Sequence, residues 1–417
     1  MAEKEKLKIK QGEPFHYDDR DREALLEILS SVLPPRSYVL DSDQNLCLLP
    51  ESYIGMLELP TRTVDIAPKI RGVGMRQVMM MYFFTKCETW DLIEAKTIFD
   101  FTEGSISESI AKKFIQELSD VLQRGLPHLY EERDCNSKYV KGRLRLDKTF
   151  ENLSMMRMEP FRCQYEETSM NNYVSRILGA ALYKIESLLP DEFVNFARYL
   201  PFCTAEEGQA LCKKYLSLSR KRGYYNSLYW ANRVLHDLQI ISIGPDQLGS
   251  SFLIDFYLLF QDFCFKVLKV FGKEYGLDVG LFASTPTICY EEPSPDGRAL
   301  KTIQPDILYK FDEYSQTAHA VLDSKCKEEL FLPADIYQIE FYSACLLARK
   351  CFLLYPYGSS LQPKTEFRIL KISDDFKNVH LKEIFAVYIG LSYETCEGFV
   401  ASMKNFAGAL AAKLKED

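Results

Sequence analysis

Two aspartates and a lysine in the C-terminal half of the chain have the types and the spacing needed for metal-dependent chemistry. Asp306 follows a proline at the start of a short apolar run, and Asp323 precedes Lys325 by two residues at the end of the next run. Carboxylates are the hard oxygen ligands that Mg²⁺ prefers, and bound Mg²⁺ polarises a phosphate and acidifies a water. A lysine beside them can position that water and neutralise charge on the transition-state phosphate. The pattern predicts hydrolysis of a phosphodiester.

Local structure would bring these three side chains together. Residues 304–309 and 320–325 are strand-like, and the intervening KFDEYSQT is typical of a hairpin turn. Side chains two apart on a strand share a face, so Asp323 and Lys325 should point the same way, with Asp306 on the neighbouring strand. Gln338 and Tyr342 are four residues apart on a helix expected over about 334–350, and so share one of its faces. From there they would contact the site or the DNA backbone.

The alternative to this interpretation is a chance match. Both motifs are short, and an aspartate before a lysine at a strand end is usually a surface ion pair. The surroundings favour a site, because a long helix is expected over about 252–275 and another after Lys325. None of the five histidines has the spacing of a metal-binding motif.

Two basic segments are candidates for contact with nucleic acid, although the net charge is −8. One is KYVKGRLRLDK (138–148). The other is LCKKYLSLSRKRG (211–223), whose candidate DNA-binding residues are Lys213, Lys214, Arg220, Lys221 and Arg222. A basic track can be local in an acidic protein. For either segment alone, a solvated helix face or loop is the alternative.

Composition points to a globular protein of more than one domain. A chain of 417 residues exceeds the size at which a single core stops growing, roughly 250–300 residues. No apolar run is long enough for a membrane span, and the charged N-terminus lacks a signal peptide's apolar core, so we expect a cytoplasmic protein. The twelve cysteines include no CxxC pair and are interpreted as reduced thiols.

The order of expected elements predicts a multi-domain α/β fold. Short strands and a few helices over 1–162 indicate a β-rich N-terminal domain, in which the Met-rich stretch from Met75 to about Thr89 is best explained as a core helix. Helical sequence follows around 168–245, inserted in a C-terminal domain over 163–417. There, a helix, strands, a helix and further strands indicate α/β layers.

Several segments, taken together, resemble the McrC family within the PD-(D/E)xK nuclease superfamily. They are IGMLELPTRTVDIAPKI (54–70), GRLRLDKT (142–149), FRCQYEETSMNNYVSRILGAAL (161–182), LLFQDFCFKVL (258–268), the PDI of 305–307, LDSKCK (322–327) and DIYQIEFYSA (335–344). They occur in the order that the family has. A structural reading of Asn171, Asn172 and Arg176, as residues that cap and brace a helix, is favoured over direct contact with DNA.

The resemblance implies a division of labour. The N-terminal part (1–162) would dock on an McrB-like AAA+ GTPase, a hexameric ring, and stimulate it, while the C-terminal part would cut DNA with Mg²⁺. A separate GTPase is needed, because this chain has no G-x-x-x-x-G-K-[ST] loop. The resemblance makes Asp306 and Asp323 metal ligands and Lys325 the catalytic lysine. Gln338 and Tyr342 would support them.

One departure from the family pattern bears on activity. Where the family usually has a glutamate in the helix before the hairpin, this chain has Gln261, and Asp262 is turned from it by about 100°. An amide oxygen can ligate a metal but supplies no charge. This leaves as an alternative an adaptor that activates the GTPase through a weak or inactive nuclease fold. A stand-alone repair nuclease is disfavoured, because the N-terminal third resembles a partner-docking module.

Overall fold

The chain forms two compact units in the computed structural model. The structure describes residues 5–86, 106–127, 129–169, 171–220, 222–244, 247–284, 288–294, 297–327, 329–358, 367–370 and 384–415. Unit 1 combines Met1–Ile106 with Ile241–Asp417, and unit 2 is Ser107–Ile240. Unit 1 is therefore built from both ends of the chain, and the multi-domain α/β class expected from the sequence is confirmed.

A five-stranded sheet in unit 1 joins segments far apart in the sequence. Its strands, in spatial order, are β1 (Glu5–Lys10), β6 (Arg62–Ala67), β5 (Tyr53–Glu58), β11 (Gln247–Asp255) and β10 (Gln239–Gly244). In the antiparallel pair of β5 and β11, Gly55 lies opposite Leu253. Gly55 has a φ of +144°, and a Cβ at this position would clash with the carbonyl oxygen of Phe252. The close crossing of the two strands thus requires glycine.

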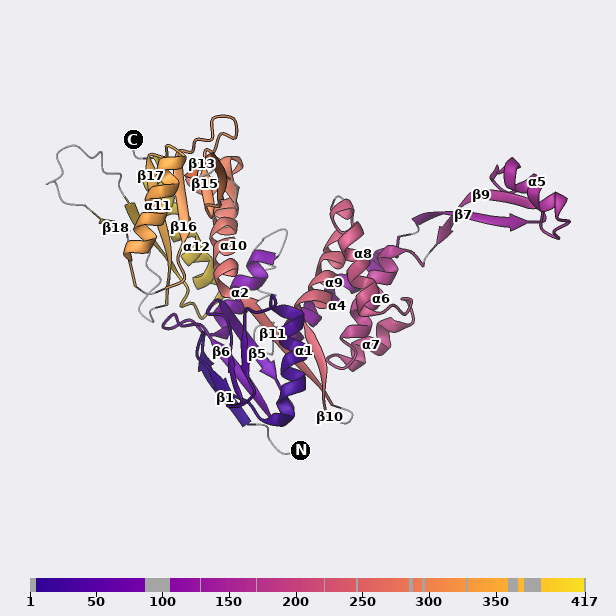
Figure 1. Cartoon of the computed structure of the whole chain (residues 1–417), viewed down its shortest axis with the longest axis horizontal. Coiled ribbons are helices and arrows are strands. Elements are labelled where there is room, and N and C mark those ends of the chain that lie inside the picture. Colours follow the sequence, from indigo (N-terminus) through magenta and orange to yellow (C-terminus); the bar gives the residue numbers. More distant parts are fainter. Residues whose placement is uncertain are drawn as a thin grey trace. The chain divides into compact units, whose positions relative to one another are not determined.

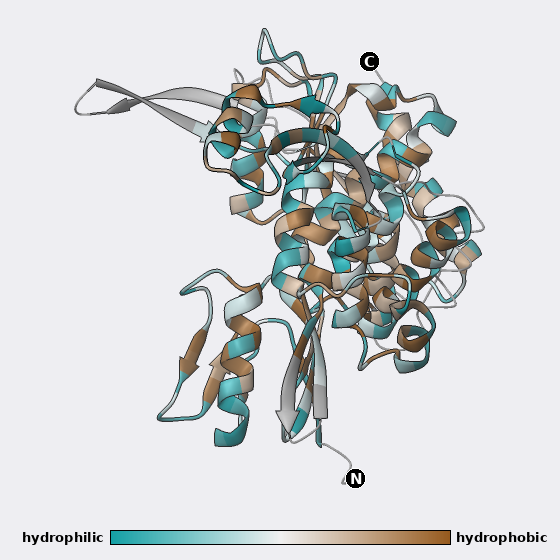
Figure 2. Ribbon diagram, turned by 90° about the vertical axis from the view of Figure 1, so that its right-hand side faces the viewer, coloured by the Kyte–Doolittle hydropathy of each residue, from teal (hydrophilic) through white to brown (hydrophobic). Residues whose placement is uncertain are grey.

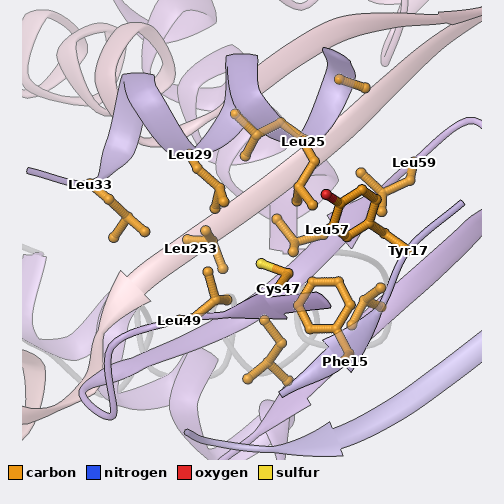
Figure 3. Close-up of a cluster of buried hydrophobic side chains, with 14 residues drawn as sticks. Phe15, Tyr17, Leu25, Leu29, Leu33, Cys47, Leu49, Leu57, Leu59 and Leu253 are labelled. Carbon is orange, nitrogen blue, oxygen red and sulfur yellow. The ribbon is translucent and has the colours of Figure 1, made fainter. Parts of the chain in front are cut away.

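The core of this part of unit 1 lies under helix α1 (Arg22–Val32), beside a small sheet of β2 (Phe15–His16), β4 (Leu46–Leu48) and β3 (Val39–Asp41). Leu25, Leu29 and Leu33 follow the helical spacing of four and point toward Leu57 and Leu253 (Figure 3). Each fully buried leucine contributes roughly 1.5–3 kcal/mol. Since Leu253 comes from β11, this core packs the two sequence segments of unit 1 against each other.

The two compact units differ from the domains expected over 1–162 and 163–417, and the expected boundary at 162/163 falls within a strand. That boundary would cut strand β9 (Phe161–Ser169), which pairs antiparallel with β7 (Leu129–Ser137) over its whole length. The separate unit begins instead at Ser107, and the N-terminal strands share a sheet with β11. Sequence patterns report local structure, whereas these pairings join distant segments.

Unit 2 contains helices and a long pair of strands. Its helices are α4 (Ile106–Arg124), α5 (Leu146–Ser154), α6 (Tyr173–Lys184), α7 (Pro190–Ala197), α8 (Ala205–Tyr215) and α9 (Tyr225–Asp237), with the 3-10 turn η2 (Ser217–Ser219). Strands β7 and β9, with the short β8 (Arg143–Leu144), carry α5 at the end far from α6 to α9 (Figure 1). We call residues 129–169, which contain β7, β8, α5 and β9, the arm.

Two local expectations in unit 2 are tested by the structure. Asn172 caps α6 by accepting hydrogen bonds from the backbone N–H groups of Val174 and Ser175, and Arg176 forms an ion pair with Glu207. The reading of Asn172 and Arg176 as structural residues is confirmed. In contrast, the alternating sequence of residues 139–149 is typical of a strand, yet only Arg143 and Leu144 form one, because helix α5 begins at Leu146.

A six-stranded sheet forms the C-terminal part of unit 1. Its order is β12 (Phe282–Ser284), β15 (Ile307–Tyr309), β16 (Ala320–Ser324), β17 (Lys350–Tyr357), β19 (Ile384–Gly390) and β18 (Phe367–Leu370). Strands β13 (Ile288–Ser294) and β14 (Gly297–Ile303) form a separate hairpin. The accompanying helices are α2 (Met75–Lys86), α10 (Phe256–Phe271), α11 (Pro333–Cys345) and α12 (Cys396–Lys415), with 3-10 turns η3 (Gly272–Tyr275) and η4 (Val279–Leu281). The 3-10 turn η1 (Asp19–Asp21) belongs to the N-terminal part, where it directly precedes α1.

Helices α10 and α11 position the site on this sheet. Helix α11 connects β16 to β17, which run parallel. Helix α10 begins at Phe256 rather than at 252, because Asp255 caps it and the preceding residues pair with β5. Along the helices apolar and polar residues alternate, as expected where one face packs on a core (Figure 2). Residues 78–84 of α2 are buried, which confirms the Met-rich stretch as a core helix as far as Lys86, while residues 87–89 lie outside the described residues.

Among the helices that the structure describes, none has both the length and the apolar character to cross a bilayer. The cysteines that it describes are free thiols.

Candidate active site

The hairpin expected from the sequence places the two aspartates side by side. Strands β15 and β16 pair antiparallel with Ile307 opposite Leu322. One residue further, this register sets Asp306 opposite Asp323. Asp323 also lies beside Leu353 of the parallel strand β17, in the interior of the sheet. Two carboxylates from neighbouring strands therefore meet at one end of the hairpin.

Asp306 is fixed by the residue between Asp323 and Lys325. Ser324 donates two hydrogen bonds to Oδ2 of Asp306, from its backbone N–H at 2.7 Å and from its hydroxyl at 2.5 Å. Burial raises the pKa of Asp306, and these two bonds only partly offset the effect. The carboxylate is thus held in one orientation at a site that disfavours its charge unless a cation is close.

Lys325 connects Asp323 to helix α11. Its Nζ forms an ion pair with Oδ2 of Asp323 at 2.5 Å and donates to Oε1 of Gln338 at 2.7 Å. Gln338 in turn donates from Nε2 to the hydroxyl of Tyr342 at 2.9 Å. The side chains Asp323, Lys325, Gln338 and Tyr342 form a continuous chain of contacts. Because Gln338 and Tyr342 are four residues apart on α11, their side chains meet, and the amide of Gln338 is held where it orients Lys325.

Burial and neighbouring charges set the protonation of Asp323 and Lys325. Burial raises the pKa of Asp323 to about 7, and the negative charge of Asp306 adds to the increase, while Lys325 opposes it. For Lys325 burial lowers the pKa, but the charges of Asp323, Asp335 and Asp306 more than compensate, and its pKa is raised overall. Lys325 is therefore positively charged, and Asp323 is poised to ionise fully when a cation binds.

A cavity of about 310 Å³ surrounds these groups. Its lining residues are Tyr257, Leu258, Gln261, Asp306, Asp323, Ser324, Lys325, Cys326, Lys327, Asp335 and Gln338. Gln261 of α10 is 8% exposed and faces this cavity, whereas the adjacent Asp262 forms an ion pair with Lys86 of α2 at 3.4 Å. Asp262 therefore does not replace the missing glutamate.

The donor set suits a magnesium ion held by few protein ligands. Apart from its ion pair with Lys325, Oδ2 of Asp323 is buried with no hydrogen-bond partner within the described ranges. Such an atom is a ready ligand for a cation. In the same ranges no group of three or more His, Cys, Asp or Glu side chains is arranged to hold a metal. Mg²⁺ commonly binds through one or two carboxylates and keeps several waters, so Asp306 and Asp323 fit it.

All five site residues expected around the hairpin are brought together, four of them in the cavity lining and Tyr342 behind Gln338. Sequence reasoning missed Ser324, Lys327 and Asp335. Ser324 lies inside the D-x-K motif itself, and Asp335 is an acidic residue in the first turn of α11, but neither pattern specifies its partner.

The candidate DNA-binding residues lie elsewhere. Lys213 and Lys214 belong to α8, Arg220 and Arg222 follow η2, and all four are exposed in unit 2. The structure does not place them in the cavity. Lys221 falls outside the described residues. His319 contacts the ring of Tyr309 and the carbonyl of Leu414, and is absent from the cavity lining.

The fold and the cavity define a mixed α/β protein with a carboxylate and lysine site at the ends of neighbouring strands. The chain also matches the sequence model of the family described as McrBC 5-methylcytosine restriction system component over residues 48–356, more than half of its length. The chain belongs to this family, which confirms the resemblance found in the sequence.

Two solved structures from Thermococcus gammatolerans are similar to the chain. A chain in a refined half-complex from a tetradecameric assembly of McrB AAA+ hexamers with bound McrC has a TM-score of 0.59 and 14% identity, over 98% of this chain and 100% of that one. A chain in the cryo-EM structure of the McrBC complex has a TM-score of 0.42 and 13% identity, over 63% of this chain and 87% of that one. The first likeness is one of fold. No curated protein matches the chain.

Proposed function

We propose that the chain is the Mg²⁺-dependent endodeoxyribonuclease subunit of an McrBC-like, modification-dependent restriction complex in the cytoplasm. The observation that carries the proposal is the meeting of Asp306, Asp323 and Lys325 in one cavity. The chain belongs to a restriction-system family, and DNA is therefore the substrate on which this chemistry would act.

Each residue has a role that follows from its contacts. Bound Mg²⁺ would polarise the scissile phosphate and acidify a water. Asp306 and Asp323 would hold the ion, with Asp306 oriented by Ser324. Lys325 would position the attacking water and neutralise charge on the phosphate, and its contact with Gln338 fixes it for this task.

A GTPase partner is the second part of the proposal. One similar structure contains McrB AAA+ hexamers with bound McrC, and we propose that this chain docks on a corresponding hexameric ring and stimulates it. The arm offers a surface suited to docking, because its end carries exposed large apolar side chains: Phe150, Leu153, Met155, Met156 and Met158. Large exposed apolar side chains gathered within a short segment are typical of interaction sites. Most of the arm lies within the 1–162 segment from which docking was expected.

Basic residues outside the cavity are proposed to contact the DNA. The exposed Lys213, Lys214, Arg220 and Arg222 in unit 2, together with Lys221, would contact the phosphate backbone without reading sequence.

Cleavage of plasmid DNA tests the proposal. Methylated and unmethylated plasmid would be incubated with Mg²⁺, with the GTPase and GTP added or withheld, and with the Asp306→Ala variant alongside. The proposal requires cleavage that depends on Mg²⁺, partner, GTP and Asp306. An adaptor with an inactive nuclease fold is the second candidate, favoured by Gln261 at the position where the family usually has a glutamate. If the chain accelerates GTP hydrolysis by the partner but no condition gives cleavage, the adaptor is supported.

A further inference from the structure

A second lysine lines the cavity beside the expected catalytic one. Lys327 Nζ lies 2.7 Å from Oδ1 and 2.6 Å from Oδ2 of Asp335, at the start of α11. We propose that Lys327 contacts a phosphate of the bound DNA strand, and that Asp335 is a positioning residue that holds both lysines. This inference rests on the proposed nuclease function and adds a residue pair that binds its substrate.

The geometry of Asp335 fits a positioning role. Its side chain is 6% exposed, so its charge must be balanced by partners inside the protein. Lys327 provides this balance with contacts to both oxygens, and Lys325 Nζ lies 3.9 Å from Oδ1. One buried carboxylate thus faces both lysines from the first turn of the helix that also carries Gln338.

The two lysines differ in what they can reach. Lys325 is 14% exposed and is held by both Asp323 and Gln338, so it is confined to the metal-binding end. Lys327 has 32% of its side chain exposed while it still lines the cavity. Lys327 can therefore meet a phosphate that enters the cavity without leaving Asp335.

The charge of the cavity also favours a substrate role for Lys327. The described lining residues contain three carboxylates and two lysines. With one Mg²⁺ bound and all three carboxylates ionised, the set carries one net positive charge, which matches one phosphodiester. Without Lys327 the set would be neutral. Removal of this lysine should therefore weaken the capture of DNA more than the binding of metal.

The test uses the full chain with its GTPase partner, and compares Lys327→Gln, Lys327→Arg, Asp335→Asn and the double variant Lys327→Gln/Asp335→Asn. Lys273→Ala is the control, since Lys273 is exposed in the same unit and outside the cavity. Single-turnover cleavage is measured against the concentration of a double-stranded oligonucleotide, and Mn²⁺ affinity is measured by calorimetry without DNA.

We expect Lys327→Gln to raise the half-saturating DNA concentration about tenfold and to reduce the salt slope of DNA binding by about one. Its Mn²⁺ affinity and limiting rate should stay within about threefold of the wild type. Lys327→Arg should restore DNA capture. Asp335→Asn should weaken DNA capture and also lower the limiting rate, and the double variant should capture DNA no worse than Lys327→Gln.

The inference is overturned if the wild type cleaves but Lys327→Gln has the same half-saturation and salt slope. It is also overturned if the losses in DNA capture add in the double variant, since the two residues would then act independently. Should Asp335→Asn not fold, the comparison of Lys327→Gln with Lys327→Arg decides alone. A wild-type complex that neither binds nor cleaves DNA would instead overturn the proposed function.

Discussion

Ser324 donates both its backbone N–H and its hydroxyl to the same carboxylate oxygen of Asp306, at 2.7 and 2.5 Å. The middle residue of the D-x-K motif thus orients the aspartate of the neighbouring strand. This position is usually left unspecified in the motif. In this chain it determines how the proposed metal ligand Asp306 is presented, because Asp306 is buried and its charge is otherwise disfavoured.

Ser324→Ala should therefore weaken metal binding. The variant keeps the backbone N–H donor but loses the hydroxyl, and a hydrogen bond to a charged group contributes about 1.5–3 kcal/mol. We expect Mn²⁺ affinity, measured by calorimetry, to fall on the order of tenfold. Ser315→Ala, in the exposed turn of the same hairpin, serves as the control and should bind Mn²⁺ like the wild type. Equal affinities for all three proteins would show that Ser324 does not orient a metal ligand.

The raised pKa of Asp323 predicts how stability depends on pH when metal is removed. The pKa is about 7 in the folded chain against an ordinary value of 3.8 for an aspartate, mainly because the side chain is buried. The folded state therefore binds the proton more tightly, and the stability that this group contributes is present below about pH 4 and lost as pH rises to about 7. In EDTA, the difference in unfolding free energy between the wild type and Asp323→Asn should decrease by a few kcal/mol across this window.

Denaturant unfolding at several pH values measures this difference. Above pH 7 the curve should be flat, and Mg²⁺ should stabilise the wild type more at pH 8 than at pH 5, because only the ionised carboxylate binds it. The same slope in Asp323→Asn would assign the pH dependence to another group.

The site residues could be predicted because their positions are set by local structure. Asp306, Asp323 and Lys325 lie on one hairpin, and Gln338 and Tyr342 lie on the helix that follows it, so strand parity and helical spacing suffice. Their partners could not be predicted. That Lys327 contacts Asp335, or that Ser324 bonds to Asp306, depends on side-chain geometry that spacing alone does not specify.

The pairing of distant strands and the division into units were harder to predict from the sequence. Glu58 and Ser251 are 193 residues apart, yet the backbone N–H of Glu58 donates to the hydroxyl of Ser251. Nothing in the apolar alternation of either strand specifies the other as its partner, and the expected boundary at 162/163 followed from treating each segment separately. The start of α10 differs from the expected residue 252 for the same reason, because the residues before Phe256 pair with β5 as part of β11.

Gln261→Glu should strengthen metal binding. Gln261 is buried in the cavity lining, and the substitution would add a carboxylate to those of Asp306, Asp323 and Asp335 with little change in volume. Affinity for Mg²⁺ and Mn²⁺ should rise on the order of tenfold, since affinity for hard cations increases with the number of charged ligands. Gln316→Glu, on the exposed turn after β15, is a matched control that should leave affinity unchanged. Unchanged or weaker binding in Gln261→Glu would show that this side chain does not reach the metal.

Two variants should separate DNA cleavage from activation of the GTPase. Asp323→Ala removes a proposed metal ligand in unit 1 and should abolish cleavage while GTP hydrolysis by the partner is stimulated as in the wild type. Met156→Asp places a charge on an arm residue that is 91% exposed, and so should leave the fold intact but disrupt an apolar contact. It should reduce stimulation of GTP hydrolysis at least about tenfold and leave Mn²⁺ affinity unchanged. Glu159→Ala, an exposed change on the same arm, is the control. Loss of stimulation in a folded Asp323→Ala protein would refute the proposed division between the cavity and the arm, and full stimulation by Met156→Asp would exclude this part of the arm from the docking surface.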